Sequence, residues 1–569
     1  MKKPKHNKLY TEAGERLVSD PSMIPWDEYP RPHMRRKEWL NLNGIWEIDT
    51  EKGYRGNVRV PFPIESLLSG FEGEIEYGER ITYRRSFSVP EGWSGKRIIL
   101  NVGAASRECS VFVNGSKEGR SCSAYFPQFG RDITDCLKAG ENELKIVCVN
   151  DLDFNYPYGK QKIKRGGMWY TPCSGLWQTV WLEPVPEEHI SEILTSQEGA
   201  AQTVYVTGVK DGAVYCDGRK FKLENGVCRI EIDAPRLWSP EEPNLYEFTV
   251  KAGEDEVQSY FGFRTVETKT IGGVPRLCLN GKPYFFNGLL DQGYFSDGIW
   301  TPAEPKEYER DILKMKSLGF NMLRKHIKIE PELFYYYCDK LGMAVFQDMV
   351  NNGIYSFFRD TLLPTVGVTK LRDRRLSERS LTRGNFVNAM RETARSLGSH
   401  PSVVYWTIFN EGWGQFEADE MYGLLKKEDP SRPIDSTSGW FHQKNTDVDS
   451  LHIYFKKLCL GKRRELPQVI SEFGGYVWKD PAHSFNLDKT YGYRLFSCQE
   501  DFVSAFRRLY LEEVVPLIKE GLSAAVYTQV SDVEDETNGI LTFDRRVMKL
   551  DTDDTADIAA ALREAMQGR

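Results

Sequence analysis

Two glutamates at the ends of apolar segments give the clearest chemical signal in the sequence. Glu411 ends the segment 403–411, which reads VVYWTIFNE, and Glu472 follows the residues QVIS at 468–471. Such segments are typical of strands buried on both faces of a parallel sheet or barrel, whose carboxyl ends hold the catalytic groups of α/β enzymes. The gap between the two glutamates leaves room for one or two further strands, at roughly 30 residues per strand–helix–strand unit.

Two opposed carboxylates are the groups that cleavage of a glycosidic bond needs. One carboxyl group protonates the leaving oxygen, while the other attacks the sugar carbon or activates water, without metal or cofactor. A single glutamate at a strand end can also be an ordinary solvated or ion-paired residue. Two of them, each after an apolar segment, favour the catalytic interpretation.

The segments around both glutamates resemble the catalytic signatures of glycoside hydrolase family 2, which includes β-galactosidases, β-glucuronidases and β-mannosidases. The resemblance rests on Asn410-Glu411 and on SEFG at 471–474, and extends to WLNLNGIW at 39–46, SGLWQTVWLEP at 174–184 and GFR at 262–264. It implies that Glu411 is the acid/base of a retaining mechanism and that Glu472 is the nucleophile. It also implies that Asn410 hydrogen-bonds the 2-hydroxyl of the sugar, a contact that strengthens in the transition state.

The apolar pattern changes twice along the chain. Up to about residue 184 it alternates with period two, and short strands continue to about residue 267. After Gly273, strands such as 284–288, 320–324 and 344–348 alternate with helices such as 305–318 and 331–341. With the resemblance, this predicts a jelly-roll sugar-binding-like β-sandwich over 1–185, an immunoglobulin-like β-sandwich over 186–268 and a catalytic (β/α)8 TIM barrel over 269–569.

One stretch of the predicted barrel lacks a clear pattern. Residues 357–383 are rich in Arg, Leu, Thr and Pro, and they predict a long loop over the barrel mouth. A helix is expected after it, over 385–397.

Polar residues at other strand ends are candidates for the substrate-binding site. Arg324 ends the second predicted barrel strand, where a guanidinium would keep a nearby nucleophilic carboxylate ionised; a core ion pair is the alternative. Asp348 ends the third strand and matches the place of a polar pair in the family. Tyr454 lies between the two catalytic strands and resembles the tyrosine that hydrogen-bonds the family's nucleophile, with a satisfied core tyrosine as the alternative.

Four further residues are candidates for contact with the sugar. His326, on the loop after the second strand, can hydrogen-bond sugar hydroxyls or be an ordinary solvated histidine. Asp291 follows the first barrel strand, where many β-galactosidases have an Arg-His-Glu type sequence that this chain lacks. Trp440 and Trp478 fall near strand ends and can stack on a pyranose, whereas Trp406 is internal to its strand and is expected in the core.

The residues after the eighth predicted strand bear on the identity of the sugar. The β-glucuronidases have an Asn-x-Lys-Gly segment there that binds the uronate carboxylate, and the corresponding stretch at 536–539 reads ETNG. An acidic residue in that place disfavours a uronic acid, unless Lys325, Lys328 or Arg545 supplies the cation.

Neither a metal nor a cofactor is expected. The Glu-x-His that binds magnesium in the large β-galactosidases is missing after Asp348, where residues 349–353 read MVNNG. The eleven cysteines and eight histidines also lack the Cys-x-x-Cys and His-x-x-x-His spacings typical of zinc sites.

Composition limits the partners and the compartment. The formal net charge of −7 argues against a nucleic acid or an anionic membrane as partner. The sequence has no apolar run of about 18 residues and no apolar stretch typical of a secretory signal. An odd number of cysteines, mostly within apolar segments, fits a reducing environment. We therefore expect a cytoplasmic protein with a glycoside or oligosaccharide substrate, and a homo-oligomer is compatible with the sequence.

These observations favour an exo-acting retaining β-glycosidase. β-Galactosides are the first expected substrates, and a β-glucuronidase, β-galacturonidase or β-mannosidase is the alternative. A protein of a different class, a catalytically silent sugar-binding protein on the same scaffold, would not need two carboxylates with opposed protonation demands.

Overall fold

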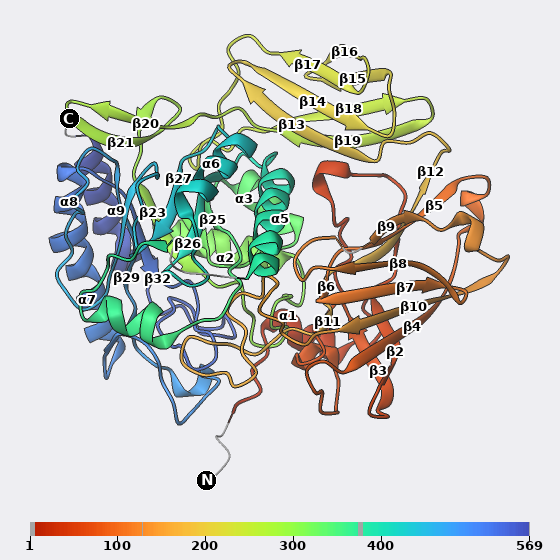
Figure 1. Cartoon of the computed structure of the whole chain (residues 1–569), viewed down its shortest axis with the longest axis horizontal. Helices are drawn as coiled ribbons and strands as arrows, with labels where there is room; N and C mark the ends of the chain where they lie inside the picture. Colours follow the sequence, from red (N-terminus) through yellow and green to blue (C-terminus); the bar gives the residue numbers. More distant parts are fainter. Residues whose placement is uncertain (1–5, 128, 374–378, 568–569) are drawn as a thin grey trace.

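The computed structural model describes residues 6–127, 129–373 and 379–567. Figure 1 shows three parts in sequence order: a β-sandwich of strands β1 to β12, a second β-sandwich of β13 to β19, and a barrel of strands and helices from β23 onward. In this view the first sandwich lies beside the barrel and the second lies above both. The predicted multidomain fold, β-rich at its N-terminus and ending in a barrel, is confirmed.

The first sandwich has two main antiparallel sheets, ordered β3-β2-β4-β10-β7-β8 and β1-β12-β5-β9. Alternate side chains point between the sheets, where Trp46, Leu100, Val111 and Leu144 form part of the core. Its strands are β1 (Leu40–Asn41), β2 (Gly44–Thr50), β3 (Arg55–Val60), β4 (Arg80–Ser88), β5 (Arg97–Val102), β6 (Ala105–Ser106), β7 (Glu108–Val113), β8 (Ser116–Cys122), β9 (Phe129–Asp132), β10 (Glu141–Val149), β11 (Gly175–Leu176) and β12 (Val180–Val185).

The second sandwich packs a sheet ordered β13-β14-β17 on a sheet ordered β16-β15-β18-β19. Val204, Val214, Phe248 and Val250 are buried between them. The strands are β13 (Glu192–Glu198), β14 (Ala201–Thr207), β15 (Gly212–Cys216), β16 (Arg219–Leu223), β17 (Val227–Glu231), β18 (Tyr246–Ala252) and β19 (Asp255–Phe261). A hairpin of β20 (Val266–Ile271) and β21 (Val274–Leu279), to which β22 (Lys282–Pro283) adds, leads into the barrel.

Within the described residues, eight parallel strands form the barrel sheet in the order β27-β26-β25-β24-β23-β32-β29-β28. The two end strands, β27 and β28, contact each other, so the barrel is nearly closed. Every residue of β26 and β29 is buried, as expected for strands covered on both faces. The strands are β23 (Phe286–Asp291), β24 (Met322–Lys325), β25 (Ala344–Asp348), β26 (Val403–Asn410), β27 (Ile434–Ser438), β28 (Asp449–Ile453), β29 (Gln468–Gly474) and β32 (Leu522–Thr528).

Helices surround the barrel sheet and bury their apolar faces on it. Ile312 and Met315 of α2, Phe386 of α5 and Phe506 of α7 belong to one core cluster with strand residues such as Trp406. The helices are α1 (Glu12–Ser19), α2 (Lys306–Ser317), α3 (Glu332–Leu341), α4 (Leu363–Thr365), α5 (Ser380–Leu397), α6 (Ala418–Glu428), α7 (Gln499–Leu509), α8 (Val515–Glu520) and α9 (Thr552–Gln567).

Element types agree with the sequence patterns better than element ends do. The strand expected at 344–348 has those bounds, and the helix expected at 305–318 is α2. The strand expected at 284–288 begins two residues later, at Phe286, and extends to Asp291. The stretch 357–383 contains a short π-helix (Phe357–Leu362) and α4, residues 374–378 lie outside the described chain, and α5 begins at Ser380 rather than Asn385.

A long excursion of the first sandwich reaches the barrel. After β10 the chain runs through residues 150–174, here called the mouth loop, before it returns to β11. The backbone N–H groups of Tyr158 and Gly159 donate to the Asn351 carbonyl, at 3.1 and 3.3 Å, just past the end of β25. Arg165 pairs with Glu534, at 3.1 Å, beyond the end of β32. The mouth loop therefore packs on the carboxyl ends of the barrel strands.

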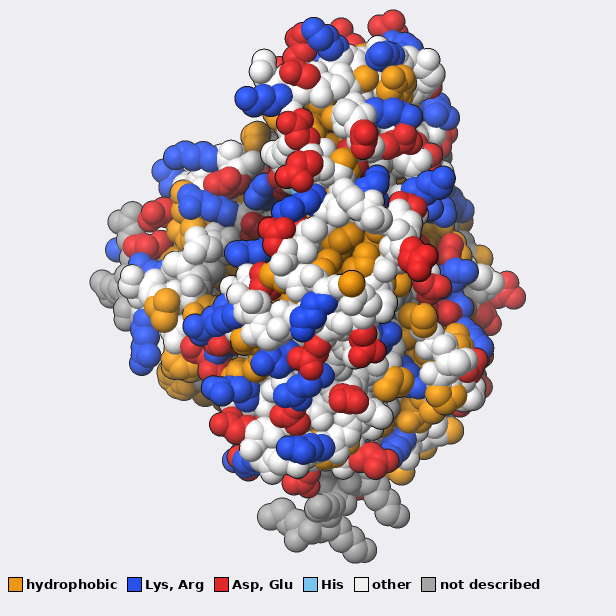
Figure 2. Space-filling view, turned by 90° about the vertical axis from the view of Figure 1, so that its right-hand side faces the viewer, with side chains coloured by type: hydrophobic (Ala, Val, Ile, Leu, Met, Phe, Trp, Pro, Cys, Tyr) orange, Lys and Arg blue, Asp and Glu red, His pale blue; other side chains and the backbone are white. Residues whose placement is uncertain are grey.

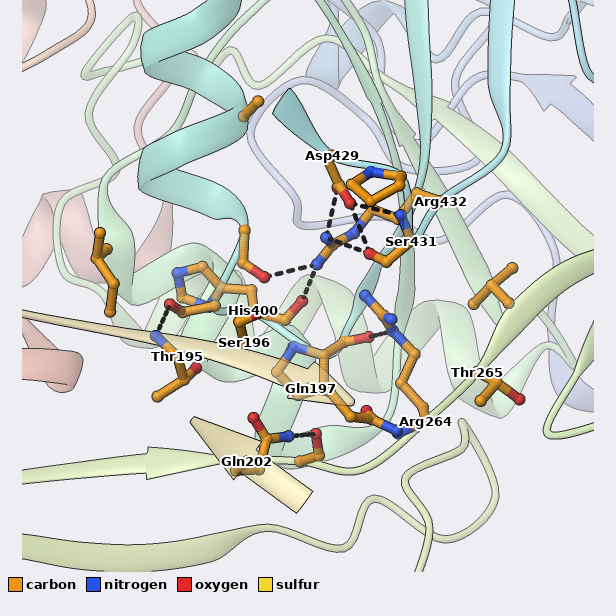
Figure 3. A pocket seen from close by; sticks show the side chains of 18 of the residues that line it. Thr195, Ser196, Gln197, Gln202, Arg264, Thr265, His400, Asp429, Ser431 and Arg432 are labelled. Atoms are coloured by element: carbon orange, nitrogen blue, oxygen red, sulfur yellow. Dashed lines mark hydrogen bonds and ion pairs between the residues drawn. The ribbon is translucent and has the colours of Figure 1, made fainter. Parts of the chain in front are cut away.

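The second sandwich contacts the opposite end of the barrel. A cavity of about 530 Å³ lies at this junction, and its lining includes Gln202, Arg264 and Arg432 (Figure 3). Both guanidinium groups donate to the carbonyl of Val403, the first residue of β26, from 3.0 Å for Arg264 and 2.6 Å for Arg432. The cavity is thus at the amino ends of the strands, away from the glutamates, and its charged groups join the two domains.

The outer face of the molecule in Figure 2 carries basic and acidic side chains intermixed rather than gathered by sign. None of the described helices is long and apolar enough to cross a membrane.

Candidate active site

The two glutamates stand at the carboxyl end of the barrel, on β26 and β29. Asn410 ends β26 and Glu411 follows with φ +54°, a left-handed conformation that costs a non-glycine residue about 1 to 3 kcal/mol. Glu472 lies within β29, where the register with β32 shifts between Ile470 and Phe473. Such irregularities redirect side chains at the rims of barrels, and strand ends with this geometry are frequent at functional sites.

The two carboxylates approach each other with one histidine between them. An oxygen of Glu411, an oxygen of Glu472 and a ring nitrogen of His452 all lie within 4.8 Å of one another. His452 Nδ1 is 2.8 Å from Glu411 Oε1 and 3.5 Å from Glu472 Oε2. The Glu411 side chain is 21% exposed and that of Glu472 only 6%, so Glu411 has more access to solvent.

Glu472 is buried among hydrogen-bond donors. Arg324 Nη1 donates to its Oε1 at 3.1 Å, and the Tyr454 hydroxyl donates to its Oε2. Burial raises the pKa of this carboxyl group, but His452, Arg324, His326 and the Tyr454 hydroxyl outweigh burial and lower the pKa to about 2. Glu472 is therefore ionised at neutral pH.

Arg324 connects most of the site. It is 1% exposed, and it donates through Nε to Asp348 Oδ1 at 3.0 Å and through Nη2 to Asn410 Oδ1 at 2.8 Å. Its Nη1 also donates to the Ser471 carbonyl at 2.9 Å. A buried guanidinium with this many partners fixes the positions of both Glu472 and Asn410.

Asp348 joins His326 to this network. His326 Nδ1 is 2.8 Å from Asp348 Oδ2, and both side chains are buried. Burial lowers the pKa of His326, and the positive charge of Lys160 lowers it further. Together these two effects outweigh the effect of Asp348, which raises the pKa. His326 is therefore neutral at neutral pH and able to exchange hydrogen bonds with a sugar hydroxyl.

The remaining predicted residues occupy different places. Trp440 is half-buried near the catalytic pair: its Nε1 donates to the Glu411 carbonyl at 3.0 Å. Trp478 is half-buried and packs against the barrel core. Asp291 is ion-paired with Lys325 at 2.7 Å, on the neighbouring strand. The structure thus groups Asn410, Arg324, His326, Asp348 and Tyr454 with the glutamates, places Trp440 beside them, and gives Asp291 and Trp478 other packing partners.

The three cations that could have replaced the missing lysine are all engaged elsewhere. Lys325 and Lys328 both pair with buried Glu330, at 2.7 and 2.9 Å. Arg545 pairs with Asp311 at 3.2 Å and donates to the Tyr294 carbonyl. None of them is free to bind a substrate carboxylate.

The sequence analysis missed several residues of the site. His452 lies in the apolar segment before Tyr454, and the sequence pattern of that segment predicts a strand but no role for the histidine. Tyr493 stacks on Tyr454 with ring centroids 3.6 Å apart. Lys160 and Tyr170 come from the mouth loop, which belongs to a different domain in the sequence; nothing local to either residue signals that it reaches the barrel.

Tyr170 and Glu536 meet at the barrel mouth. The Tyr170 hydroxyl donates to Glu536 Oε2, and Asn538 Nδ2 donates to its Oε1 at 3.1 Å. Burial raises the pKa of Glu536, and the charge of Lys160 opposes that rise. The acidic residue noted in the sequence therefore belongs to a hydrogen-bonded cluster shared between the barrel and the mouth loop.

Comparison with protein families agrees with this architecture. Residues 274–472 match the model described as glycosyl hydrolases family 2, TIM barrel domain, and residues 187–264 match the model described as glycosyl hydrolases family 2. The chain is 28% identical over 520 residues to a β-galactosidase of Aeromonas hydrophila, covering 78% of this chain and 46% of that protein. It is 26% identical over 465 residues to a β-glucuronidase of Bacteroides fragilis, covering 71% of this chain and 61% of that protein. The chain thus spans about half the length of the curated relatives it matches.

Solved structures resemble the whole chain. A β-D-glucuronidase of Dictyoglomus thermophilum has a TM-score of 0.72 at 18% identity, covering 95% of this chain and 99% of that one. A β-galacturonidase of Eisenbergiella tayi has a TM-score of 0.66 at 19% identity, with the same coverage of both chains. At identities of 18% and 19%, these matches show a similar fold and no more. The two proteins are also named for different activities.

Proposed function

This chain belongs to glycoside hydrolase family 2, and we propose that it is a retaining exo-β-glycosidase that removes terminal nonreducing β-linked sugars. The observation that carries the proposal is the ionised, buried Glu472 with a Glu411 oxygen within 4.8 Å of its own. Retaining enzymes hold their carboxyl groups about 5 to 5.5 Å apart, whereas inverting enzymes need about 6.5 to 9.5 Å to admit water. The short separation supports the retaining mechanism.

The roles follow from the surroundings of each glutamate. Glu472, ionised and fixed by Arg324 and Tyr454, attacks the anomeric carbon and forms a glycosyl ester. Glu411, more exposed and bonded to His452, gives its proton to the leaving oxygen and then takes a proton from the water that hydrolyses the ester. Asn410, held by Arg324, is placed to hydrogen-bond the 2-hydroxyl as charge develops on the ring.

We propose a β-galactoside-like neutral sugar as the first substrate. Glu536 stands where β-glucuronidases are expected to carry a carboxylate-binding group, and a second anion next to it is unfavourable. A β-glucuronide or β-galacturonide is the second candidate, because the relatives include enzymes named for those substrates and because Lys160 brings a cation to the mouth. A silent sugar-binding protein is less well supported, because binding alone does not require an ionised nucleophile beside a second carboxylate.

We propose that the protein works in the cytoplasm. All eleven cysteines are free, and most are buried as small apolar side chains, which fits a reducing compartment. Assembly into a homo-oligomer is a separate prediction, which light scattering of the purified protein would measure.

A screen of nitrophenyl β-glycosides tests the proposed activity. The wild-type protein should release nitrophenol from at least one of the galactoside, glucuronide, galacturonide and mannoside. Glu472→Gln should abolish that release. Activity that survives Glu472→Gln, or wild-type protein inactive on all four while folded, would refute the proposal.

A further inference from the structure

Lys160 enters the barrel mouth from the first sandwich through a fixed stretch of backbone. The Tyr170 N–H donates to the Lys160 carbonyl at 2.9 Å, and the preceding Gly159 N–H donates to the Asn351 carbonyl at 3.3 Å. Gly159 has φ +65°, and a Cβ there would lie 2.8 Å from the Ile327 carbonyl and 2.8 Å from the Tyr125 hydroxyl. A glycine is therefore needed to place Lys160 next to the loop that carries His326.

The Lys160 side chain is half-buried and has no direct partner of its own. Within the described part of the chain, its amine makes neither a hydrogen bond nor an ion pair. Its charge nevertheless acts on two buried groups of the mouth, because it lowers the pKa of His326 and that of Glu536. The backbone places Lys160 beside the loop that carries His326, and it also hydrogen-bonds Lys160 to Tyr170, whose hydroxyl donates to Glu536.

Within the described residues, Glu536 makes no ion pair, unlike the other carboxylates of the mouth. Glu472 and Asp348 share Arg324, and Asp348 also pairs with His326. Arg165 of the mouth loop pairs with Glu534. The groups that hydrogen-bond Glu536, Tyr170 and Asn538, are neutral donors, and the charge of Lys160 opposes the rise in the pKa of Glu536 that burial causes.

We propose that the Lys160 ammonium and the Glu536 carboxylate both line the wall of the sugar-binding pocket, and that these two opposite charges make the site select a neutral sugar over a uronic acid. The inference rests on the proposed function and names the substrate class of that same site. A sugar hydroxyl can accept a hydrogen bond from the ammonium group and donate one to the carboxylate. A uronate would add a second anion against one cation, a repulsion that a partly buried site screens poorly.

Neutralising Glu536 should therefore invert the selectivity. In Glu536→Gln the Lys160 charge is uncompensated, and the ratio of kcat/KM for nitrophenyl β-galacturonide to that for nitrophenyl β-galactoside should rise by about tenfold or more. These two substrates differ only at C6, which isolates the charge. Lys160→Met should lower this ratio and should also lower kcat/KM for the galactoside. The double variant should not show the rise in the ratio that Glu536→Gln shows alone.

Glu534→Gln is the matched control, because Glu534 is buried in the same loop but pairs with Arg165 and the Thr171 N–H. It should leave the ratio unchanged. Lys160 is half-buried, so Lys160→Met tests the proposal even if Glu536→Gln fails to fold. The proposal is overturned if the wild type prefers the uronide, if Glu536→Gln folds and leaves the ratio within about twofold of wild type, or if Lys160→Met raises the ratio. Wild-type protein inactive on every nitrophenyl β-glycoside would instead refute the proposed function.

Discussion

At the scale of single residues, Arg324 keeps Glu472 ionised and fixes the position of Asn410. It neutralises Asp348 and Glu472 while it holds the Asn410 amide, so a cation, two carboxylates and a substrate-binding amide share one buried cluster. Removing one member of such a cluster leaves a buried charge without a partner, which typically costs about 3 to 5 kcal/mol. The catalytic roles proposed for the two glutamates thus depend on a residue that need not touch the reacting bond.

The lowered pKa of Glu472 predicts a pH-dependent contribution to stability. Because the folded pKa is about 2 and lies below the ordinary value of 4.5, the contribution is present above about pH 4.5 and is lost as the pH falls toward 2. Glu472→Gln lacks this contribution. Urea unfolding at about pH 5 and about pH 3 should therefore show that the wild type loses more free energy of unfolding than Glu472→Gln does. Equal losses would show that the folded structure does not hold Glu472 ionised.

The exposure of Glu411 predicts chemical rescue. Glu411→Gln should still form the glycosyl ester from activated aryl glycosides, because their leaving groups need little protonation, but it should hydrolyse the ester slowly. Added azide should restore turnover by attacking the ester, and the product should be the β-glycosyl azide. Rescue of Glu472→Gln instead, with an inverted glycosyl azide, would reverse the two assignments.

The sequence was most informative where a polar or charged residue stands at the end of a predicted strand. Glu411, Glu472, Asn410, Arg324 and Asp348 all follow or end apolar segments, so the parallel-sheet rule places them at one end of the barrel. His452 and Lys160 could not be found in this way. His452 lacks a distinguishing neighbour, and Lys160 belongs to another domain, so only the folded structure shows that the mouth loop brings Lys160 to the barrel.

At the scale of elements, the alternation of strands and helices was predictable, but loop positions were not. Apolar periodicity identifies α2, which buries one face, and a continuous apolar run identifies β25, in which every residue is buried. Neither pattern fixes the ends of β23, because the apolar run begins at Tyr284, two residues before the first residue that pairs with a neighbouring strand, and the pairing continues to the polar Asp291. The mouth loop has neither periodicity nor regular structure, and its path is set by contacts with another domain.

The tight approach of the mouth loop predicts a strong effect of a small substitution. Gly159→Ala would force a Cβ against the Ile327 carbonyl and strain a positive φ, which should displace Lys160 and lower kcat/KM for the galactoside by about tenfold or more. Gly140→Ala is the matched control, since Gly140 has φ +83° with nothing within 4 Å of its Cβ position. It shares the backbone strain without the clash. Equal effects of the two substitutions on kcat/KM would show that the path of the mouth loop is not important for catalysis.

At the scale of the whole molecule, the site is shared between domains. The barrel supplies Glu411 and Glu472, the proposed catalytic carboxylates, and the first sandwich supplies Lys160 and Tyr170 through the mouth loop, while the second sandwich contacts the barrel at its other end (Figures 1 and 3). The order of a β-rich N-terminal part and a C-terminal barrel could be predicted from the apolar pattern together with the family resemblance. The contribution of the first domain to the pocket could not, because a sandwich that resembles a sugar-binding module gives no sign of which neighbour its loops contact.

Trapping of the covalent intermediate tests the central claim, that Glu472 is the nucleophile of a retaining glycosidase. A 2-deoxy-2-fluoro β-glycoside with a good leaving group slows both steps but slows hydrolysis of the ester more, so the glycosyl-enzyme accumulates. Mass spectrometry of the digested protein should find one added fluorosugar, on the peptide that contains Glu472. A label on the peptide that contains Glu411, or an active enzyme that forms no adduct and releases the α-anomer first, would contradict the account.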